Sequence, residues 1–184
     1  MQPILAAEDR SSPLNVNLKN AAVVRDTLLC AALSSNVAVG AFDATSGSST
    51  WRAPQPVGRV VIHPSSTLCS KRDLARTRPL LVYHTLNVTT QPFIRDVSVV
   101  SPVALMLFSD FTIRHQDSRA TLLRSGDVTV IVDAQTAVLV KALKGAVQRE
   151  VTRRVAHPNA AVSTELQQAV ARIIQESESS RRLY

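Results

Sequence analysis

The sequence predicts a mainly β domain built on a five-stranded closed barrel with flanking helices. The main observation is the segment 80–88, where apolar and polar side chains alternate as they do in a half-buried strand. Residues that favour strands continue beyond Pro92 to Val100, and the Ser-Pro pair that follows predicts the start of a short apolar helix over 103–108. A long bent strand that runs directly into a short helix suits a small closed barrel.

The residues before this central segment predict one helix and two strands. Residues 1–16 show no clear period and are interpreted as a tail or the end of a preceding domain. From Asn20, a candidate N-cap, apolar residues recur at helical spacing as far as Ser34. Strands are expected over 36–42 and 59–62, because both runs are short, apolar and bounded by turn residues.

Two loops are predicted beside these strands. Residues 43–58 mix Ser, Thr, Gly and Pro with the only tryptophan, Trp51, and we expect a mobile insertion there. Residues 65–79 form the second loop, which is the most basic segment of the chain. Its four cationic residues are Lys71, Arg72, Arg76 and Arg78.

The residues after the central segment predict three short strands and two helices. The strands are expected over 112–115, 121–124 and 127–132, and together with the earlier ones they supply the strands of the barrel. Asp133 can cap a helix with one apolar side, which Pro158 ends, and a last amphipathic helix covers 164–175. The predicted organisation is a tail over 1–16, a barrel domain over 17–158 and a C-terminal helix with a frayed tail over 159–184.

Composition limits the partners and the compartment. The chain has 184 residues and a formal net charge of +7, which favours a polyanionic partner such as a nucleic acid. Cys30 and Cys69 have no metal-site spacing, so we expect reduced, partly buried thiols of an intracellular protein. No apolar run approaches the roughly 20 residues of a membrane span, and we expect a soluble chain without a membrane partner.

Catalytic motifs are absent from the sequence. There is no GxxxxGK[ST] loop, no GxSxG turn, no HExxH motif and no motif of paired carboxylates. His84 falls on the apolar face of its predicted strand, which favours a structural histidine over a catalytic one. We therefore expect this chain alone to be no enzyme, with no catalytic residue, cofactor-binding residue or metal ligand.

The central segment also carries a family resemblance. VYHTLNVTTQPFIRDVSVVSPVALMLF resembles the C-terminal module of the DEAH-box, RNA helicase A-type, ATP-dependent RNA helicases, in which a VYH segment leads into an IRD triplet, a VSP turn and a Leu-Leu-Phe helix. AAVVRDTLLCAALSSNVAV and VVIHPSSTL are similar to the same module in the same order, so the resemblance covers roughly residues 17–155. It implies an oligonucleotide/oligosaccharide-binding fold, or OB-fold, that helps to hold single-stranded RNA at a motor. The motor would lie outside this sequence, where ATP and Mg²⁺ are expected.

The resemblance makes RNA contacts the first functional hypothesis. OB-folds bind single strands through a basic groove and aromatic stacking platforms. Because aromatic residues make up 4% of the chain, we expect phosphate contacts to dominate and binding to depend strongly on salt. Tyr83, on the predicted polar face of its strand, is the candidate stacking residue, with a position at the edge of the core as the alternative. The candidate phosphate contacts are Lys71, Arg72, Arg76, Arg78, Arg95, Arg114, Arg119 and Arg124.

Other roles remain open for these residues and for the chain. The loop and hairpin cations can be solvated surface residues, and Arg95 can form a local ion pair with its neighbour Asp96. The alternative function is a protein-docking module that touches RNA little, with Trp51 and the apolar helix faces as the docking surface. The resemblance implies RecA-like and ratchet domains of the same helicase as partners, and G-patch or zinc-finger proteins as regulators.

Overall fold

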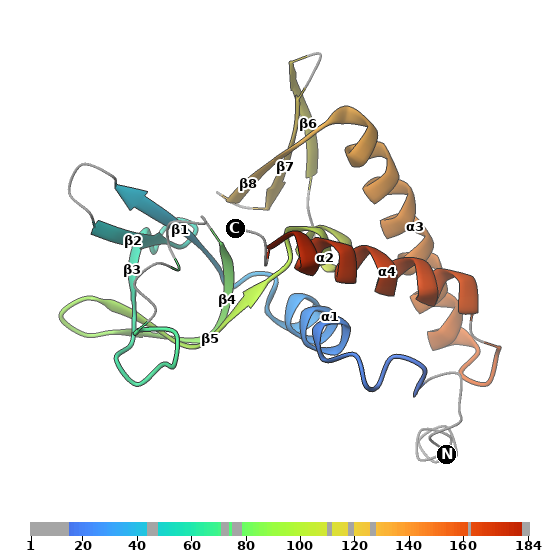
Figure 1. Ribbon diagram of the computed structural model, residues 1–184, viewed down its shortest axis with the longest axis horizontal. Helices are drawn as coiled ribbons and strands as arrows, with labels where there is room; N and C mark the ends of the chain where they lie inside the picture. The colour runs from blue at the N-terminus through green and yellow to red at the C-terminus, as the bar shows by residue number, and fades with distance from the viewer. Residues whose placement is uncertain are drawn as a thin grey trace.

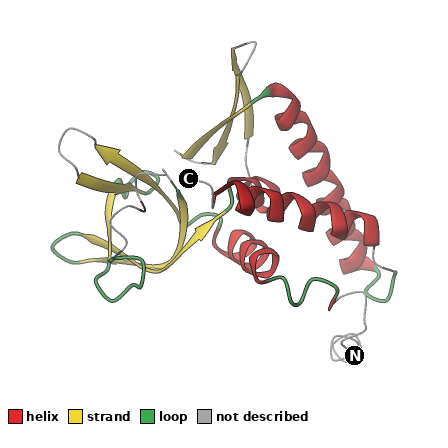
Figure 2. Ribbon diagram, in the orientation of Figure 1, coloured by secondary structure: helices red, strands yellow, loops and turns green. Residues whose placement is uncertain are grey.

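The computed structural model shows a barrel, a group of helices and a small separate sheet (Figure 1). It describes residues 15–43, 48–70, 74, 79–109, 112–117, 120–125, 128–161 and 163–181 of the chain. In the view of Figure 1 the barrel lies on the left, the helices gather on the right and the small sheet stands above them. Figure 2 shows the same separation of strands from helices.

The barrel consists of the first five strands. They are β1 (Val37–Asp43), β2 (Ser48–Arg52), β3 (Arg59–Ile62), β4 (Leu80–Val88) and β5 (Pro92–Val100). The order around the barrel is β1-β2-β3-β5-β4, and β4 closes it by pairing with β1. All neighbours are antiparallel except β3 and β5, which are parallel. The predicted five-stranded barrel is therefore confirmed.

The second strand of the barrel lies in the segment that was predicted to be a mobile insertion. Trp51 pairs with Gly40 of β1 on one side and with Val60 of β3 on the other. Its side chain is only 8% exposed and packs in the barrel core. The prediction of a partner-binding Trp51 is therefore wrong for this structure, because turn-forming residues on both sides hid a strand whose tryptophan fills the barrel.

The three later strands form a sheet of their own. They are β6 (Thr112–Asp117), β7 (Ala120–Ser125) and β8 (Val128–Val132), paired in that order as antiparallel neighbours. Strands were expected at these places, but their assignment to the barrel is wrong. The barrel closes without them because β2 supplies the strand that the sequence did not reveal.

Four helices complete the described part of the chain. They are α1 (Ala21–Leu33), α2 (Pro102–Phe108), α3 (Ala134–Ala156) and α4 (Thr164–Arg181). Asn20 caps α1 by accepting a hydrogen bond from Val23 N–H, and Asp133 caps α3 by accepting one from Thr136 N–H, as the sequence predicted. None of the helices in the residues described is long and apolar enough to cross a membrane.

Two layers of the core lie on the two sides of β4, and a third cluster, Met106, Leu107 and Val140, joins α2 to α3. Leu81 and Tyr83 point into the barrel, where they pack with Ile94. Leu80 and Val82 point to the opposite side, where α1, α2 and α4 cover them. The outer layer also contains the following buried residues: Val23, Cys30, Val37, Val100, Ala104, Leu105, Ala171 and Ile174. The helices thus cover the outer face of β4, and both faces of this strand contribute side chains to the core.

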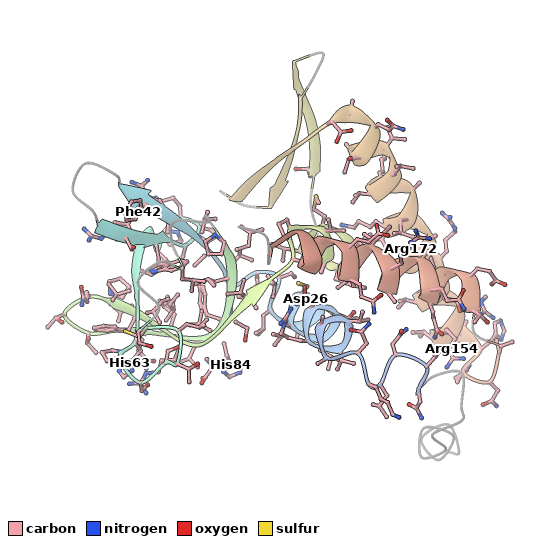
Figure 3. All side chains as sticks on the ribbon, viewed as in Figure 1. Asp26, Phe42, His63, His84, Arg154 and Arg172 are labelled. Atoms are coloured by element: carbon pink, nitrogen blue, oxygen red, sulfur yellow. The ribbon has the colours of Figure 1, made fainter. Side chains whose placement is uncertain are left out.

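A buried carboxylate joins α1 to the junction between β5 and α2. Asp26 is fully buried, and its Oδ2 atom accepts a hydrogen bond of 3.0 Å from Ser101 N–H. Its Oδ1 atom accepts one of 2.7 Å from Arg25 Nε–H. The Ser101 hydroxyl does not cap α2 but lies 2.6 Å from the Ser177 hydroxyl of α4. Figure 3 shows Asp26 at this meeting point of barrel and helices.

We predict that Asp26→Asn lowers the free energy of unfolding by about 2 to 3 kcal/mol, because both carboxylate oxygens face donors and an amide offers only one acceptor. Urea denaturation would measure this loss. Asp133→Asn is the matched control, since Asn is also a good N-cap and the Thr136 hydroxyl bound to Oδ2 can reverse its hydrogen bond. Equal effects of the two substitutions would contradict the role given to Asp26.

A second prediction concerns the contact between β1 and β2. A Cβ atom at Gly40 would lie 2.8 Å from Trp51 Cζ3 and 3.0 Å from Pro79 Cδ. We therefore expect Gly40→Ala to destabilise the barrel by about 1 to 3 kcal/mol through overpacking. The fluorescence of the single tryptophan during thermal unfolding reports on this site.

Gly145→Ala in α3 is the control for this substitution. Its Cβ would meet only the end of the Arg149 side chain, at 3.3 Å, so alanine is expected to be neutral or stabilising there. An unchanged melting temperature of Gly40→Ala would show that the barrel does not need the close approach of Trp51.

Candidate nucleic-acid interface

Arg95 lies where β3 and β5 run side by side. The parallel register pairs Ile62 with Ile94, and His63 N–H donates a hydrogen bond of 3.0 Å to the Ile94 carbonyl. The residues that follow these two strand positions, His63 and Arg95, are therefore neighbours. Arg95 Nη2 lies 2.6 Å from His63 Nε2, and the His63 ring meets the Phe93 ring edge to face with centroids 5.5 Å apart.

His63 holds Arg95 from the side of β3. A guanidinium can only donate, so His63 Nε2 is the acceptor in this contact, which a neutral imidazole allows. On the other side of the ring, Nδ1 lies 2.7 Å from Ser65 Oγ and 3.1 Å from Ser65 N. The contacts with Ser65 hold the ring in place beside the guanidinium.

Within the described residues, no carboxylate neutralises the positive charge of Arg95. Among the residues described, Arg95 makes no ion pair, and the local pair with Asp96 that the sequence left open does not form. Its Nε–H is buried and has no hydrogen-bond partner within the same part of the chain. A half-buried guanidinium held by a neutral imidazole keeps its full attraction for an anion.

A small pocket opens beside this guanidinium. Its volume is about 290 Å³, and it is lined by Ser65, Ser66, Thr67, Arg95, Asp96 and Val97. Three of these residues carry hydroxyl groups, which can donate to a phosphate or a sugar oxygen. The volume is at the lower end of the range for ligand pockets, so it suits one sugar-phosphate unit better than a complete nucleotide.

Asp96 occupies an unusual backbone conformation at the edge of the pocket. Its φ angle is +52°, and it is the single non-glycine residue with positive φ in the described ranges. Aspartate tolerates this left-handed region better than most residues, yet it is uncommon inside a strand. The antiparallel pairing of β4 with β5 continues on both sides of Asp96, where Tyr83 pairs with Val97 and Thr85 pairs with Arg95.

The predicted stacking residue is not available to a base. Tyr83 is 5% exposed and packs inside the barrel, where burial raises the pKa of its hydroxyl. The prediction that it lies on a polar face is wrong, because β4 is covered by apolar side chains on both faces from Leu80 to Tyr83. The next residue, His84, is exposed instead of apolar-facing, since the helical cover ends there. Figure 3 shows His84 and His63 along the same side of the barrel.

Most of the other predicted contacts cannot be placed beside Arg95. Lys71, Arg72, Arg76, Arg78 and Arg119 lie outside the described residues. Arg114 and Arg124 lie in β6 and β7, where the backbone register pairs Arg114 with Leu122 and Thr112 with Arg124.

Of the residues predicted from the sequence, Arg95 alone is brought to this pocket in the part of the chain that is described. Sequence reasoning missed His63 and Ser65. The HPSS run after β3 was visible, but nothing local indicated that it lies beside Arg95.

A second, apolar groove lies between α1, α3 and α4. It has a volume of about 540 Å³, and its walls include Val23, Phe108, Val147, Val151, Val155 and Val170. Val151 and Val155 belong to the apolar side that was predicted for α3, and they remain 57% and 77% exposed. Glu150 and Arg154 lie at the same groove, and the bond from Arg153 lowers the pKa of Glu150. The groove is thus apolar with charged side chains along α3.

Comparison with known proteins identifies relatives of this fold. A family model described as the oligonucleotide/oligosaccharide-binding (OB)-fold matches residues 26–112. The DExH-box ATP-dependent RNA helicase DExH4, chloroplastic, of Arabidopsis thaliana is 28% identical over 145 residues, which cover 74% of this chain and 10% of the helicase. The chain therefore spans about a tenth of the length of the curated relative that it matches. The family match contains the whole Arg95 pocket.

Proposed function

We propose that the chain binds and guides single-stranded RNA for an ATP-dependent RNA helicase of the DEAH type, on the premise that its residues 26–112 match the model of the oligonucleotide/oligosaccharide-binding OB-fold family. The observation that carries the proposal is the Arg95 guanidinium, which has a neutral histidine as its partner and a pocket beside it. Phosphate is the anion that a single strand offers at regular intervals, and Arg binds it with a planar pair of donors.

The motor is proposed to be part of the same full-length protein. The similar Arabidopsis protein is named as an ATP-dependent RNA helicase, and the match covers a tenth of it. In our proposal ATP and Mg²⁺ bind to RecA-like domains outside this sequence, and the OB-fold lies beside those domains and a ratchet domain along the RNA path. The activity of this chain is then binding, and the hydrolysis of ATP belongs to the rest of the protein.

We predict that Arg95→Gln weakens the binding of a labelled ten-nucleotide oligouridylate about tenfold at low salt. Fluorescence anisotropy across a salt series would measure the affinity and its salt dependence. The slope of log K against log salt should become shallower by roughly 0.7, the value for one lost phosphate contact on a single strand. Arg95→Lys should keep the slope but lose part of the affinity, because the ammonium lacks the planar fork.

Arg172→Gln is the matched control. It removes the same charge from an exposed α4 residue, which pairs with Glu176 at 2.8 Å. Its effect on RNA binding should be small. If the domain is folded and Arg95→Gln behaves like Arg172→Gln, or if the wild type binds no RNA at low salt, the RNA-binding proposal fails.

Protein docking is the second candidate, and the apolar groove is the observation that favours it. Arg153 and Arg154 at the end of α3 leave a positive excess beside Glu150. The complementary occupant is an amphipathic helix with apolar residues on one face and acidic residues on the other. Such a helix would belong to a regulatory protein or to another domain of the helicase.

A synthetic amphipathic helix rich in leucine and glutamate tests this candidate. Docking in the groove predicts that Val155→Ser weakens its binding at least fivefold, because Val155 lines the groove, whereas Val138→Ser on the same helix has little effect. Isothermal titration calorimetry would measure both. Equal effects of the two substitutions would exclude docking at this groove, and RNA binding should be unchanged in both variants.

A further inference from the structure

Asp96 is a carboxylate in a pocket that otherwise offers hydrogen-bond donors. It lines the pocket together with Arg95 and the hydroxyl residues 65–67. Its side chain is exposed and makes no hydrogen bond or ion pair with any other residue in the described ranges. A carboxylate at this position repels a phosphate, so phosphate binding by Arg95 does not by itself explain the composition of the pocket.

The backbone conformation of Asp96 brings its carboxylate to the same side as Arg95. In a regular strand, successive side chains point to opposite faces. Here Ile94 and Val97 are both buried in the barrel core, whereas Arg95 and Asp96 between them are not buried and line the pocket. The φ angle of +52° at Asp96 marks the place where the alternation is interrupted. A strained backbone that places a polar side chain in a pocket is typical of functional sites.

A ribonucleotide carries two groups that match this pair of charges. Its 2′-hydroxyl can donate to a carboxylate, and its 3′-phosphate, on the adjacent ring carbon, can accept from a guanidinium. Residues 95 and 96 have Cα atoms about 3.8 Å apart, as all sequence neighbours do. Their side chains can therefore contact the 2′-hydroxyl and the 3′-phosphate of one nucleotide.

We propose that Asp96 accepts a hydrogen bond from the ribose 2′-hydroxyl while Arg95 holds the neighbouring phosphate, so that this pocket distinguishes RNA from DNA. The inference rests on the proposed RNA-binding function and adds a specificity to it. It involves no base contact, in agreement with a pocket that suits a sugar-phosphate unit better than a complete nucleotide.

Three oligomers that differ only at the 2′ position test the proposal on the complete 184-residue chain. They are ten-nucleotide oligouridylate, its 2′-fluoro analogue, which keeps the RNA sugar conformation but lacks the donor, and oligodeoxyuridylate. The wild type is expected to bind the oligouridylate about tenfold more tightly than the 2′-fluoro analogue, the effect of one hydrogen bond to a charged group. Anisotropy at a single low salt concentration would measure the ratio.

Asp96→Gly is the decisive variant, because glycine adopts positive φ freely and removes only the carboxylate. It should bind the 2′-fluoro oligomer and the DNA more tightly than the wild type does, since the repulsion of phosphate is lost, and the ratio should fall to about one. Asp96→Asn, which also tolerates this conformation, should keep part of the ratio because its amide oxygen still accepts. Melting temperatures would show that both variants are folded.

Glu165→Gln serves as the control for charge. It removes one negative charge from the first turn of α4, and we expect a small, equal gain for all three oligomers. A wild type that binds RNA and the 2′-fluoro analogue equally, or an Asp96→Gly variant that keeps the preference, would overturn this inference and leave the RNA-binding proposal intact. A folded wild type that binds none of the oligomers would overturn both.

Discussion

The fold depends on the burial of β4 on both faces. Leu81 and Tyr83 fill the barrel on one side, while Leu80 and Val82 form the surface on which the helices pack. A strand that is covered on both sides must have its backbone groups fully paired, and β4 pairs with β1 and β5. The barrel and the helical layer therefore pack on opposite faces of the same strand. Asp26 adds a directional contact between α1 and Ser101, because a buried carboxylate needs its donors in fixed positions.

The same closure creates the candidate site. β3 and β5 are the parallel pair of the barrel, and a parallel pair brings the two chain segments beyond its ends to the same edge. The HPSS segment that leaves β3 therefore lies along β5 at Arg95. The position of the pocket is a consequence of strand order, which explains why residues 30 positions apart in the sequence contribute to it.

The sequence was sufficient for features that depend on local chemistry and insufficient for those that depend on pairing. The caps at Asn20 and Asp133 were predicted because single residues dictate them. The expectation of one long bent strand through Pro92 is wrong, because the segment forms two strands, β4 and β5, that pair as antiparallel neighbours. β2 was missed, since its serine and threonine residues resemble a loop until Trp51 is seen to fill the barrel. Tyr83 was placed on a polar face because alternation along one strand cannot reveal that helices cover its outer side. The resemblance identified Arg95, but His63 and Ser65 required the parallel register.

The partner of Arg95 decides how much charge the site can offer. A carboxylate partner would have neutralised the guanidinium and left only a dipole for a ligand. A neutral histidine fixes the side chain by one hydrogen bond and leaves its charge intact, at the cost of a buried Nε–H that has no partner among the residues described. The nearest carboxylate in sequence, Asp96, is turned by its positive φ into the pocket, where it pairs with no described residue. Opposite charges that share a pocket without pairing remain available to a ligand that carries both a donor and an anion. A ribose with its phosphate is such a ligand, whereas a free phosphate or a deoxyribose strand satisfies only one of the two charges.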